Sequence, residues 1–165
     1  MGFWKTWEFK WPSVDAHINI KNLSYQNLKK RIKKNEGFSL KSYKDQLGFF
    51  TIGFGHLILP NEKYLLEKKI NKTELEKIFI KDFNRALKNF NIFLKPFSFN
   101  RRSSELLIEM IFQMGIESVL KFKKLLHNMH KGNKHLICFE MMNSLWYKQT
   151  PHRVKNLIST FLKNE

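Results

Sequence analysis

The sequence contains very little cysteine, because Cys138 is the only one among 165 residues, and the chain therefore cannot form an internal disulfide bond. It also has only 14 acidic residues against 30 lysines and arginines, which gives a formal net charge of +16. Such an excess indicates an anionic partner, which could be nucleic acid, a membrane surface or an acidic polymer of the cell envelope. A general bias of the chain toward lysine explains the charge equally well, so charge alone does not choose among these partners.

Long apolar runs are also missing. No stretch approaches the roughly 20 apolar residues that a membrane-spanning helix needs. Near the start of the sequence, Glu8 and Lys10 stand where a secretory signal would have its apolar segment. We therefore expect no signal peptide and a protein made in the cytoplasm of its host.

Several kinds of ligand site lack their usual residues. The run Gly53-Phe54-Gly55 has neither the third glycine nor the following helix of a phosphate-binding loop. The basic stretch 25–36 lacks the interleaved aromatic residues of a nucleic-acid module. His127, His130 and His135 have no acidic or cysteine ligands beside them. We accordingly expect no cofactor, no metal and no nucleic-acid partner.

Residues 1–22 differ in composition from the rest of the chain and hold three of its four tryptophans, Trp4, Trp7 and Trp11. One interpretation is contact with a membrane or another part of the envelope, through this segment and the basic surface. The other is a strap whose aromatic side chains pack on the body of the protein. The low charge of the segment argues against a membrane-disrupting peptide, and we favour the strap.

The remaining periodicities predict a mainly helical α+β fold. A basic helix over 25–36, capped by Asn22 or Ser24, is followed by short strands at 40–45, 49–52 and 57–59 and a short helix at 62–69. Asn71 and Glu74 form a capping box that opens a long helix to about residue 94. Helices are expected at 100–113, 119–130, 135–144 and 151–162. The predicted organisation is an extension (1–25) and one domain (26–165), with a small β-hairpin lobe (about 36–70) joined by the long helix (about 72–94) to a helical lobe (about 100–162).

Glu36, Asp45 and Thr51 are the candidate reactive groups. Gly37 can end the first helix directly after Glu36, and the hairpin then brings Asp45 and Thr51 toward it. Cleavage of a glycosidic bond needs a proton for the leaving oxygen and a group that activates water on the opposite face of the sugar. A glutamate, an aspartate and a hydroxyl around one cleft could supply these functions. A purely structural pair of carboxylates is the alternative.

Three blocks of sequence make the interpretation more specific. The run from Asn35 to Leu57, with Glu36, Asp45 and Thr51 at their observed spacing, resembles the active-site segment of the T-even phage lysozymes, glycoside hydrolase family 24. Ile111-Phe112-Gln113-Met114-Gly115 and the run from Ser144 to Arg153 resemble two further blocks of that family. Together with the long helix, the resemblance covers about residues 26–162 and implies a lysozyme-like fold.

The resemblance also implies roles for individual residues. Glu36 would be the general acid, with Asp45 and Thr51 holding the attacking water, and the reaction would invert the anomeric carbon. The substrate would be the β-1,4 bond between N-acetylmuramic acid and N-acetylglucosamine in peptidoglycan. Arg153 would orient the acid. The sugar-contacting positions would be Leu57, Phe112, Leu125 and Glu140, where Leu125 replaces a serine of the family and Glu140 an asparagine.

The expected function is that of an endolysin, a bacteriolytic and antimicrobial muramidase that causes cytolysis. It would reach the periplasmic cell wall after a holin opens the inner membrane, and it would act as a monomer. Two alternatives remain. One is a virion-associated lysozyme of a tail or baseplate, and the other is a cell-wall-binding module without activity.

Overall fold

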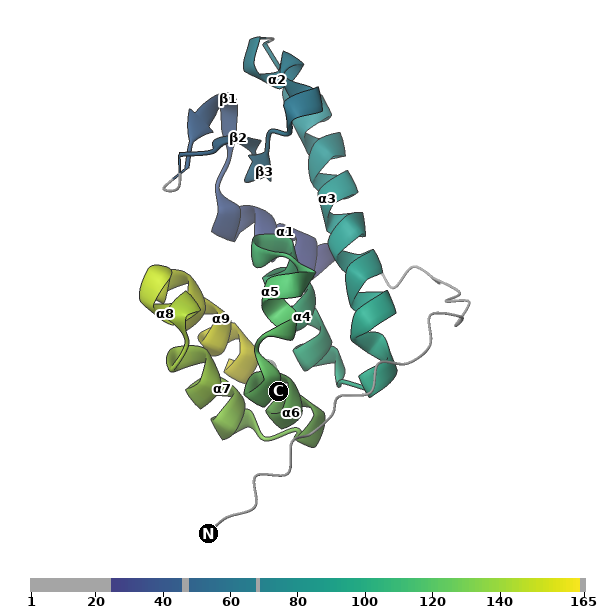
Figure 1. Ribbon diagram of the computed structural model, residues 1–165, viewed down its shortest axis with the longest axis vertical. Helices are drawn as coiled ribbons and strands as arrows, with labels where there is room; N and C mark the ends of the chain where they lie inside the picture. The colour runs from purple at the N-terminus through teal and green to yellow at the C-terminus, as the bar shows by residue number, and fades with distance from the viewer. Residues whose placement is uncertain (1–24, 46–47, 68, 164–165) are drawn as a thin grey trace.

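The computed structural model describes residues 25–45, 48–67 and 69–163, and it shows a small sheet-bearing lobe and a larger helical lobe (Figure 1). The first part of the chain contains α1 (Gln26–Glu36), β1 (Ser39–Lys44), β2 (Phe50–Gly53), β3 (His56–Leu57), η1 (Pro60–Glu62) and α2 (Tyr64–Glu67). The second part contains α3 (Lys72–Phe93), η2 (Lys95–Phe97), α4 (Arg101–Met114), α5 (Ile116–Leu120), α6 (Lys123–Lys131), α7 (Lys134–Met142), α8 (Leu145–Gln149) and α9 (Pro151–Lys163).

The three strands form one antiparallel sheet in the order β1-β2-β3. Thr51 on β2 lies opposite Tyr43 on β1 and opposite Leu57 on β3. Because directly paired residues share a face of a sheet, these three side chains form a row across one face. The neighbouring pair Ile52 and His56 points to the other face, where both side chains are buried.

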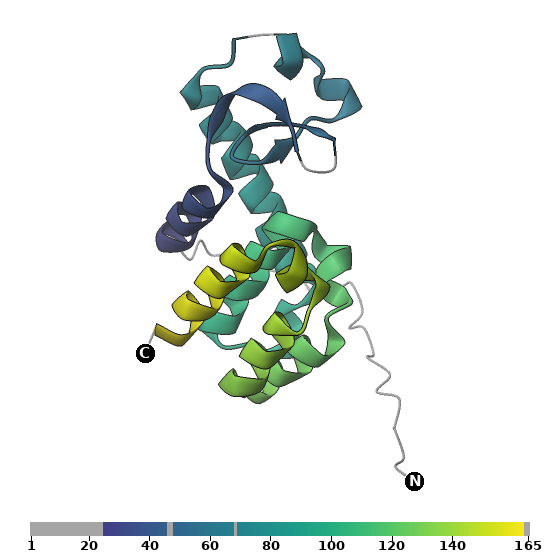
Figure 2. The ribbon, with the colours of Figure 1, turned by 90° about the vertical axis from the view of Figure 1, so that its left-hand side faces the viewer.

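The long helix α3 runs from the small lobe into the helical lobe, as Figures 1 and 2 show. It begins at a capping box, in which the Asn71 side chain accepts from the backbone N–H of Glu74 at 2.8 Å. Leu75, in its first turn, packs in the small-lobe core with Ile52. Buried phenylalanines further along, at 79, 83 and 90, belong to the large core. One helix therefore contributes to both cores, as the sequence predicts.

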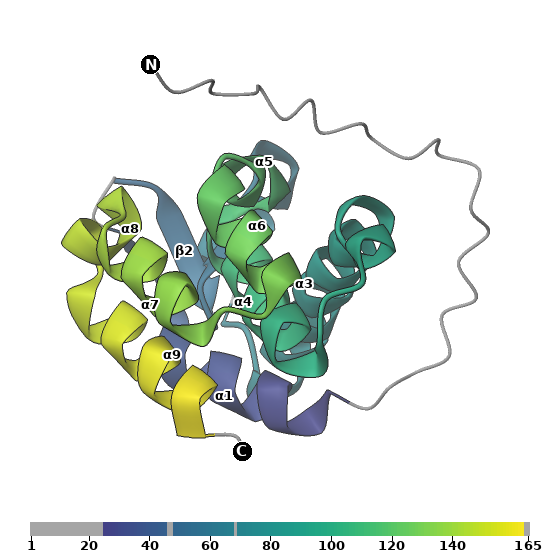
Figure 3. The same cartoon turned by 90° about the horizontal axis from the view of Figure 1, so that it is seen from below.

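The helical lobe is built around α4, which Figure 3 shows among the other helices. Leu107, Ile108 and Met110 on this helix are completely buried. Asn100 caps its first turn, accepting from Ser103 N at 2.8 Å, and Gly115 ends it with a φ of +78°. The central position of α4 explains why three successive turns of it carry apolar side chains on several faces.

The predicted fold class is confirmed, with local differences. The single helix expected over 119–130 is two helices, α5 and α6, separated at Lys121 and Phe122. The third strand is shorter than expected, and the five-residue α8 was not predicted as a helix. The strap of residues 1–22 and the expected caps Asn22 and Ser24 lie outside the described residues. The boundaries of the domain and of its lobes stay predictions.

Candidate active site

Glu36 lies at the last position of α1, and Gly37 follows it with a φ of +73°. Its side chain is only 14% exposed. One carboxylate oxygen, Oε1, accepts a hydrogen bond from Nη2 of Arg153 in the first turn of α9. The end of α1 thus places Glu36, and Arg153 of α9 binds one of its two carboxylate oxygens.

The other oxygen, Oε2, faces the turn between β2 and β3. A Cβ atom built on Gly55 would lie 3.0 Å from it. Gly55 has a φ of +81°, a conformation that glycine adopts at little cost. Phe54 fixes this turn, because its ring packs on the ring of Phe79 of α3 at a centroid distance of 5.3 Å. Glycine at position 55 therefore lets the turn lie directly against the carboxylate.

Asp45 directly follows β1 and organises the hairpin turn. Its backbone N–H donates to Phe49 O at 2.9 Å, and its Oδ1 accepts from Phe49 N at 2.9 Å. These bonds position the carboxylate at the end of the strand. Thr51 lies nearby on β2, 6% exposed, with its hydroxyl 3.4 Å from Phe49 O. The hairpin therefore holds the second carboxylate and the hydroxyl on one small unit.

Tyr43 of β1 interacts electrostatically with two carboxylates, those of Glu36 and Asp45. Burial raises the pKa of its phenol, and the negative charges of Glu36 and Asp45 raise it further. Its phenol therefore lies within electrostatic reach of both carboxylates, and its strand position lies opposite Thr51. The sequence predictions assign Tyr43 no role beyond its place in a strand. In the strand expected over 40–45, Tyr43 shares a face with Asp45 two residues later. This spacing was the signal in the sequence that could have placed Tyr43 near the site.

A second polar cluster lies on the opposite face of the sheet and is also absent from the sequence predictions. His56 Nδ1 is 2.7 Å from Asp82 Oδ2 of α3, and its Nε2 is 2.9 Å from Glu62 Oε2 of η1. Burial lowers the pKa of His56, but the hydrogen bonds and charges of the two carboxylates more than offset this, so the pKa is raised above 6.5. We call His56, Asp82 and Glu62 the His56 cluster.

The predicted sugar-contacting residues lie in different environments. Leu57 is 45% exposed and stands beside Thr51 on the sheet. Phe112 and Glu140 are half-buried on α4 and α7. Leu125 is 1% exposed and belongs to the large core. A side chain buried to this degree offers no surface to a sugar, so in this structure Leu125 serves packing, whereas the other three positions remain candidates.

The second and third sequence blocks also meet. Trp146 Nε1 of α8 donates to Gln113 Oε1 of α4 at 3.2 Å. This contact holds the segment that leads into α9, and hence Arg153, against the central helix. Across the described ranges, no group of three His, Cys, Asp or Glu side chains is arranged to hold a metal ion. Among the same residues, no helix is both long and apolar enough to cross a membrane.

Comparison with known proteins identifies the family of this chain. Residues 33–160 match the family model described as phage lysozyme. The chain belongs to the phage lysozyme family. It is 33% identical over 160 residues to the probable T4-type lysozyme 2 of Dictyostelium discoideum, covering 82% of this chain and 93% of that protein. For the probable T4-type lysozyme 1 of the same organism the identity is 34% over 158 residues, with 81% and 92% covered.

A virion protein is also similar. The pre-baseplate central spike protein Gp5 of Enterobacteria phage T4 is 28% identical over 153 residues, which is 79% of this chain but only 27% of the spike protein. Membership of the family makes this protein a glycoside hydrolase, a lysozyme, with a muramidase-like function and peptidoglycan as the implied substrate. The roles of the individual site residues remain predictions.

Proposed function

We propose that this lysozyme hydrolyses the β-1,4 bond between N-acetylmuramic acid and N-acetylglucosamine in peptidoglycan, with inversion at the anomeric carbon. The observation that carries the proposal is the Glu36 carboxylate, which Arg153 holds from one side while the Gly55 turn approaches it from the other. Asp45 and Thr51 stand on the neighbouring hairpin. Acid and water-holding groups thus come from separate elements, as a sugar lying between them requires.

In the proposed reaction Glu36 donates a proton to the leaving glycosidic oxygen. Arg153 occupies Oε1, so the proton is delivered from Oε2, the oxygen beside Gly55. The Asp45 carboxylate accepts a proton from the attacking water, and the Thr51 hydroxyl orients that water. Because Oδ1 of Asp45 already accepts from Phe49 N, its direction is fixed before substrate binds.

Leu57, Phe112 and Glu140 are proposed to line the path of the glycan. Leu57 offers an apolar surface beside Thr51, and Glu140 offers a carboxylate to sugar hydroxyls. The net charge of +16 favours association with an acidic cell wall, and this attraction weakens as salt increases.

We propose the role of an endolysin that lyses bacterial cells and acts as a monomer. This chain matches 93% and 92% of the length of two relatives named as lysozymes, which supports a lysozyme that is not part of a larger spike protein. The similarity to the spike protein supports the alternative, a lysozyme carried by a virion. As an endolysin the protein would be made in the host cytoplasm and reach the periplasmic wall after holin action.

The test compares Glu36→Gln with Glu67→Gln, which removes an exposed glutamate of α2. On purified peptidoglycan, Glu36→Gln should lose about 10²–10⁴-fold in rate, and Glu67→Gln should match the wild type. The anomer of the first product reports inversion or retention. Intact and chloroform-permeabilised cells are assayed in parallel, and an endolysin should lyse only the permeabilised ones. Retained hydrolysis by Glu36→Gln would reject the assignment of the acid.

A further inference from the structure

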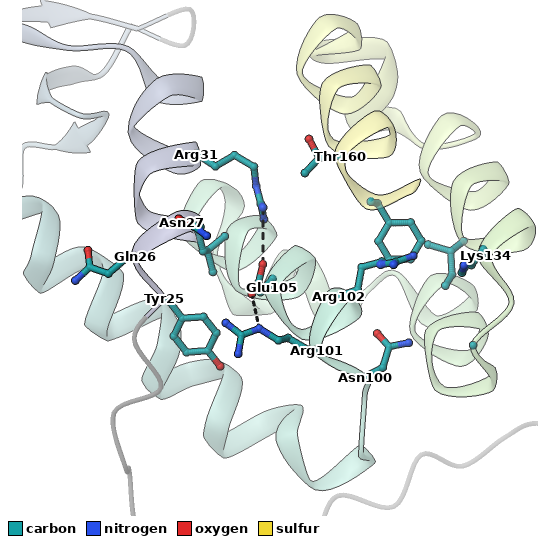
Figure 4. Close-up of a pocket in the computed structure, with 14 residues that line it drawn as sticks. Tyr25, Gln26, Asn27, Arg31, Asn100, Arg101, Arg102, Glu105, Lys134 and Thr160 are labelled. Carbon is teal, nitrogen blue, oxygen red and sulfur yellow. Dashed lines mark hydrogen bonds and ion pairs between the residues drawn. The ribbon is translucent and has the colours of Figure 1, made fainter. Parts of the chain in front are cut away.

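Two basic residues of α1 attach this helix to different elements. Arg31 reaches Glu105 of α4, with 3.8 Å between Nη1 and Oε2, as Figure 4 shows. Lys33 forms an ion pair with Glu76 of α3. Because α1 ends at Glu36, these contacts anchor the helix that carries the proposed acid to both α4 and α3.

The ammonium group of Lys33 also lies over two aromatic rings. Its Nζ is 5.0 Å from the centre of the Phe54 ring and 4.7 Å from the centre of the Phe79 ring of α3. The two rings pack on each other with 5.3 Å between their centroids, so one cation contacts both. A cation within about 6 Å of a ring centroid is attracted to the face of the ring. The Lys33 side chain is 27% exposed, and the ion pair with Glu76 holds its ammonium over the rings.

The Phe54 ring belongs to the turn that meets the proposed acid. Phe54 directly precedes Gly55, whose backbone lies against Oε2 of Glu36. Lys33 and Glu36 are three positions apart on α1, a spacing that places two side chains on one face of a helix. The cation and the acid therefore extend from one helix to one turn, the first to Phe54 and the second to Gly55.

We infer that Lys33 is a positioning residue for the general acid. It holds the Phe54 ring against α3, and this contact keeps the following Gly55 beside Glu36. The close backbone limits the movement of Oε2, the oxygen proposed to deliver the proton. Small displacements of a reacting group lower the rate, because less of the protein population has the reactive geometry. The inference rests on the proposed role of Glu36, and its test distinguishes the failure of either claim.

Lys29 provides a matched control, because it makes the same kind of contact one turn earlier on α1. Its Nζ lies 5.0 Å from the centre of the Phe83 ring of α3. Both lysines are half-buried, and Phe83 belongs to the large core. Lys29→Met therefore removes one positive charge and one cation–π contact from the same helix, whereas Lys33→Met removes the cation over the ring next to Gly55.

The experiment measures kcat and KM on soluble peptidoglycan fragments, at a temperature well below the melting point of each variant. Lys33→Met should lower kcat about tenfold and leave KM within about twofold, because it affects the acid and not the residues proposed to line the glycan path. Lys29→Met should leave both constants within about twofold. Lys33→Arg should recover most of the rate, since a guanidinium also stacks on aromatic rings and pairs with carboxylates. If Lys33→Met fails to fold, Glu76→Gln, which releases the ammonium, replaces it and should lower kcat in the same way.

Hydrogen exchange gives a second measurement that does not depend on activity. The amides of Phe54 and Gly55 should exchange faster in Lys33→Met than in Lys29→Met, while those of α4 keep their protection. Equal kcat in these two variants, an equal loss in Lys33→Arg, or unchanged exchange at the turn would overturn the inference. Glu36→Gln is measured in parallel. If it is inactive while Lys33→Met is fully active, only the positioning role is wrong; if it keeps the wild-type rate, the proposed acid is wrong and the inference fails with it.

Discussion

The His56 cluster should make the stability of this lysozyme depend on pH in a defined direction. Both ring nitrogens of His56 face carboxylate oxygens, at 2.7 Å and 2.9 Å. A neutral imidazole carries a single N–H, so only the protonated ring can donate to Asp82 and Glu62 together. The ring is 7% exposed, and the two carboxylates are 10% and 15% exposed. The cluster is therefore poorly screened by solvent.

The sign follows from the directions in which the two pKa values move. The pKa of His56 is raised, so its contribution to the free energy of unfolding is fully present below about pH 6.5 and is lost as the pH rises through the folded-state value. For Glu62, burial raises the pKa, but the Leu59 N–H, His56 and Lys81 outweigh it, so the pKa is lowered. Its contribution is present above about pH 4.5 and is lost as the pH falls through the folded value. The two contributions overlap between these limits, so the cluster stabilises the fold most in mildly acidic solution.

Asp82→Asn removes the carboxylate with the shorter contact and leaves a buried charge with one partner. We expect a loss of about 3–5 kcal/mol in the free energy of unfolding near pH 6. Urea denaturation from pH 5 to pH 10 measures it, and the difference from the wild type should shrink as His56 loses its proton. The control is Arg85→Met, which removes the exposed partner 3.1 Å from Asp82 and should cost less than about 1 kcal/mol. A difference that stays constant over this range would refute the electrostatic explanation and leave packing as the cause.

Two further predictions concern the surroundings of Glu36. Gly55→Ala should displace the Glu36 carboxylate and reduce kcat about 10–100-fold. The control is Gly115→Ala, which has a similar positive φ but no described atom within 4 Å of the added methyl. This control should lower only the stability of the protein. Comparison of kcat and melting temperature checks this, and equal kcat in the two variants would contradict it. Glu109→Gln should lower the free energy of unfolding by about 3–5 kcal/mol, as measured by urea denaturation. The reason is that the fully buried carboxylate accepts from Arg31 at 2.7 Å and from Asn35 at 2.8 Å. An unchanged urea midpoint would show that this network contributes little to stability.

The sequence predicted the ends of helices correctly where neighbouring residues alone determine them. The Asn71–Glu74 capping box and the glycine that ends α1 needed only neighbouring residues, and the structure confirms both. The break between α5 and α6 was missed because apolar residues continue through it. Phe122 at the break packs edge-on against Trp146 at 6.3 Å, a tertiary contact that local periodicity cannot reveal.

The polar contacts around the site were the least predictable part. Glu36 and Arg153 are 117 positions apart, and only the family resemblance connected them. His56 and Asp82 are 26 positions apart, and Arg31 and Glu109 are 78 apart. Such pairs depend on the packing of α1, α3 and α4, and no periodicity in the sequence specifies which charge meets which. Leu125 shows the converse, since a position carried over from a family pattern is buried here as an apolar core residue.

The two halves of the proposed active site are supported by different networks. Glu36 is fixed from the helical lobe, by Arg153 directly and by the bond of its neighbour Asn35 to Glu109. Asp45 and Thr51 are carried by the sheet, which the His56 cluster and Ile52 attach to α3. Loosening the His56 cluster should therefore move the water-holding groups relative to the acid. In Asp82→Asn, kcat at a temperature well below the melting point should fall while the helical lobe keeps its protection from hydrogen exchange. A loss of protection in both lobes together would instead show that the two supports unfold as one unit.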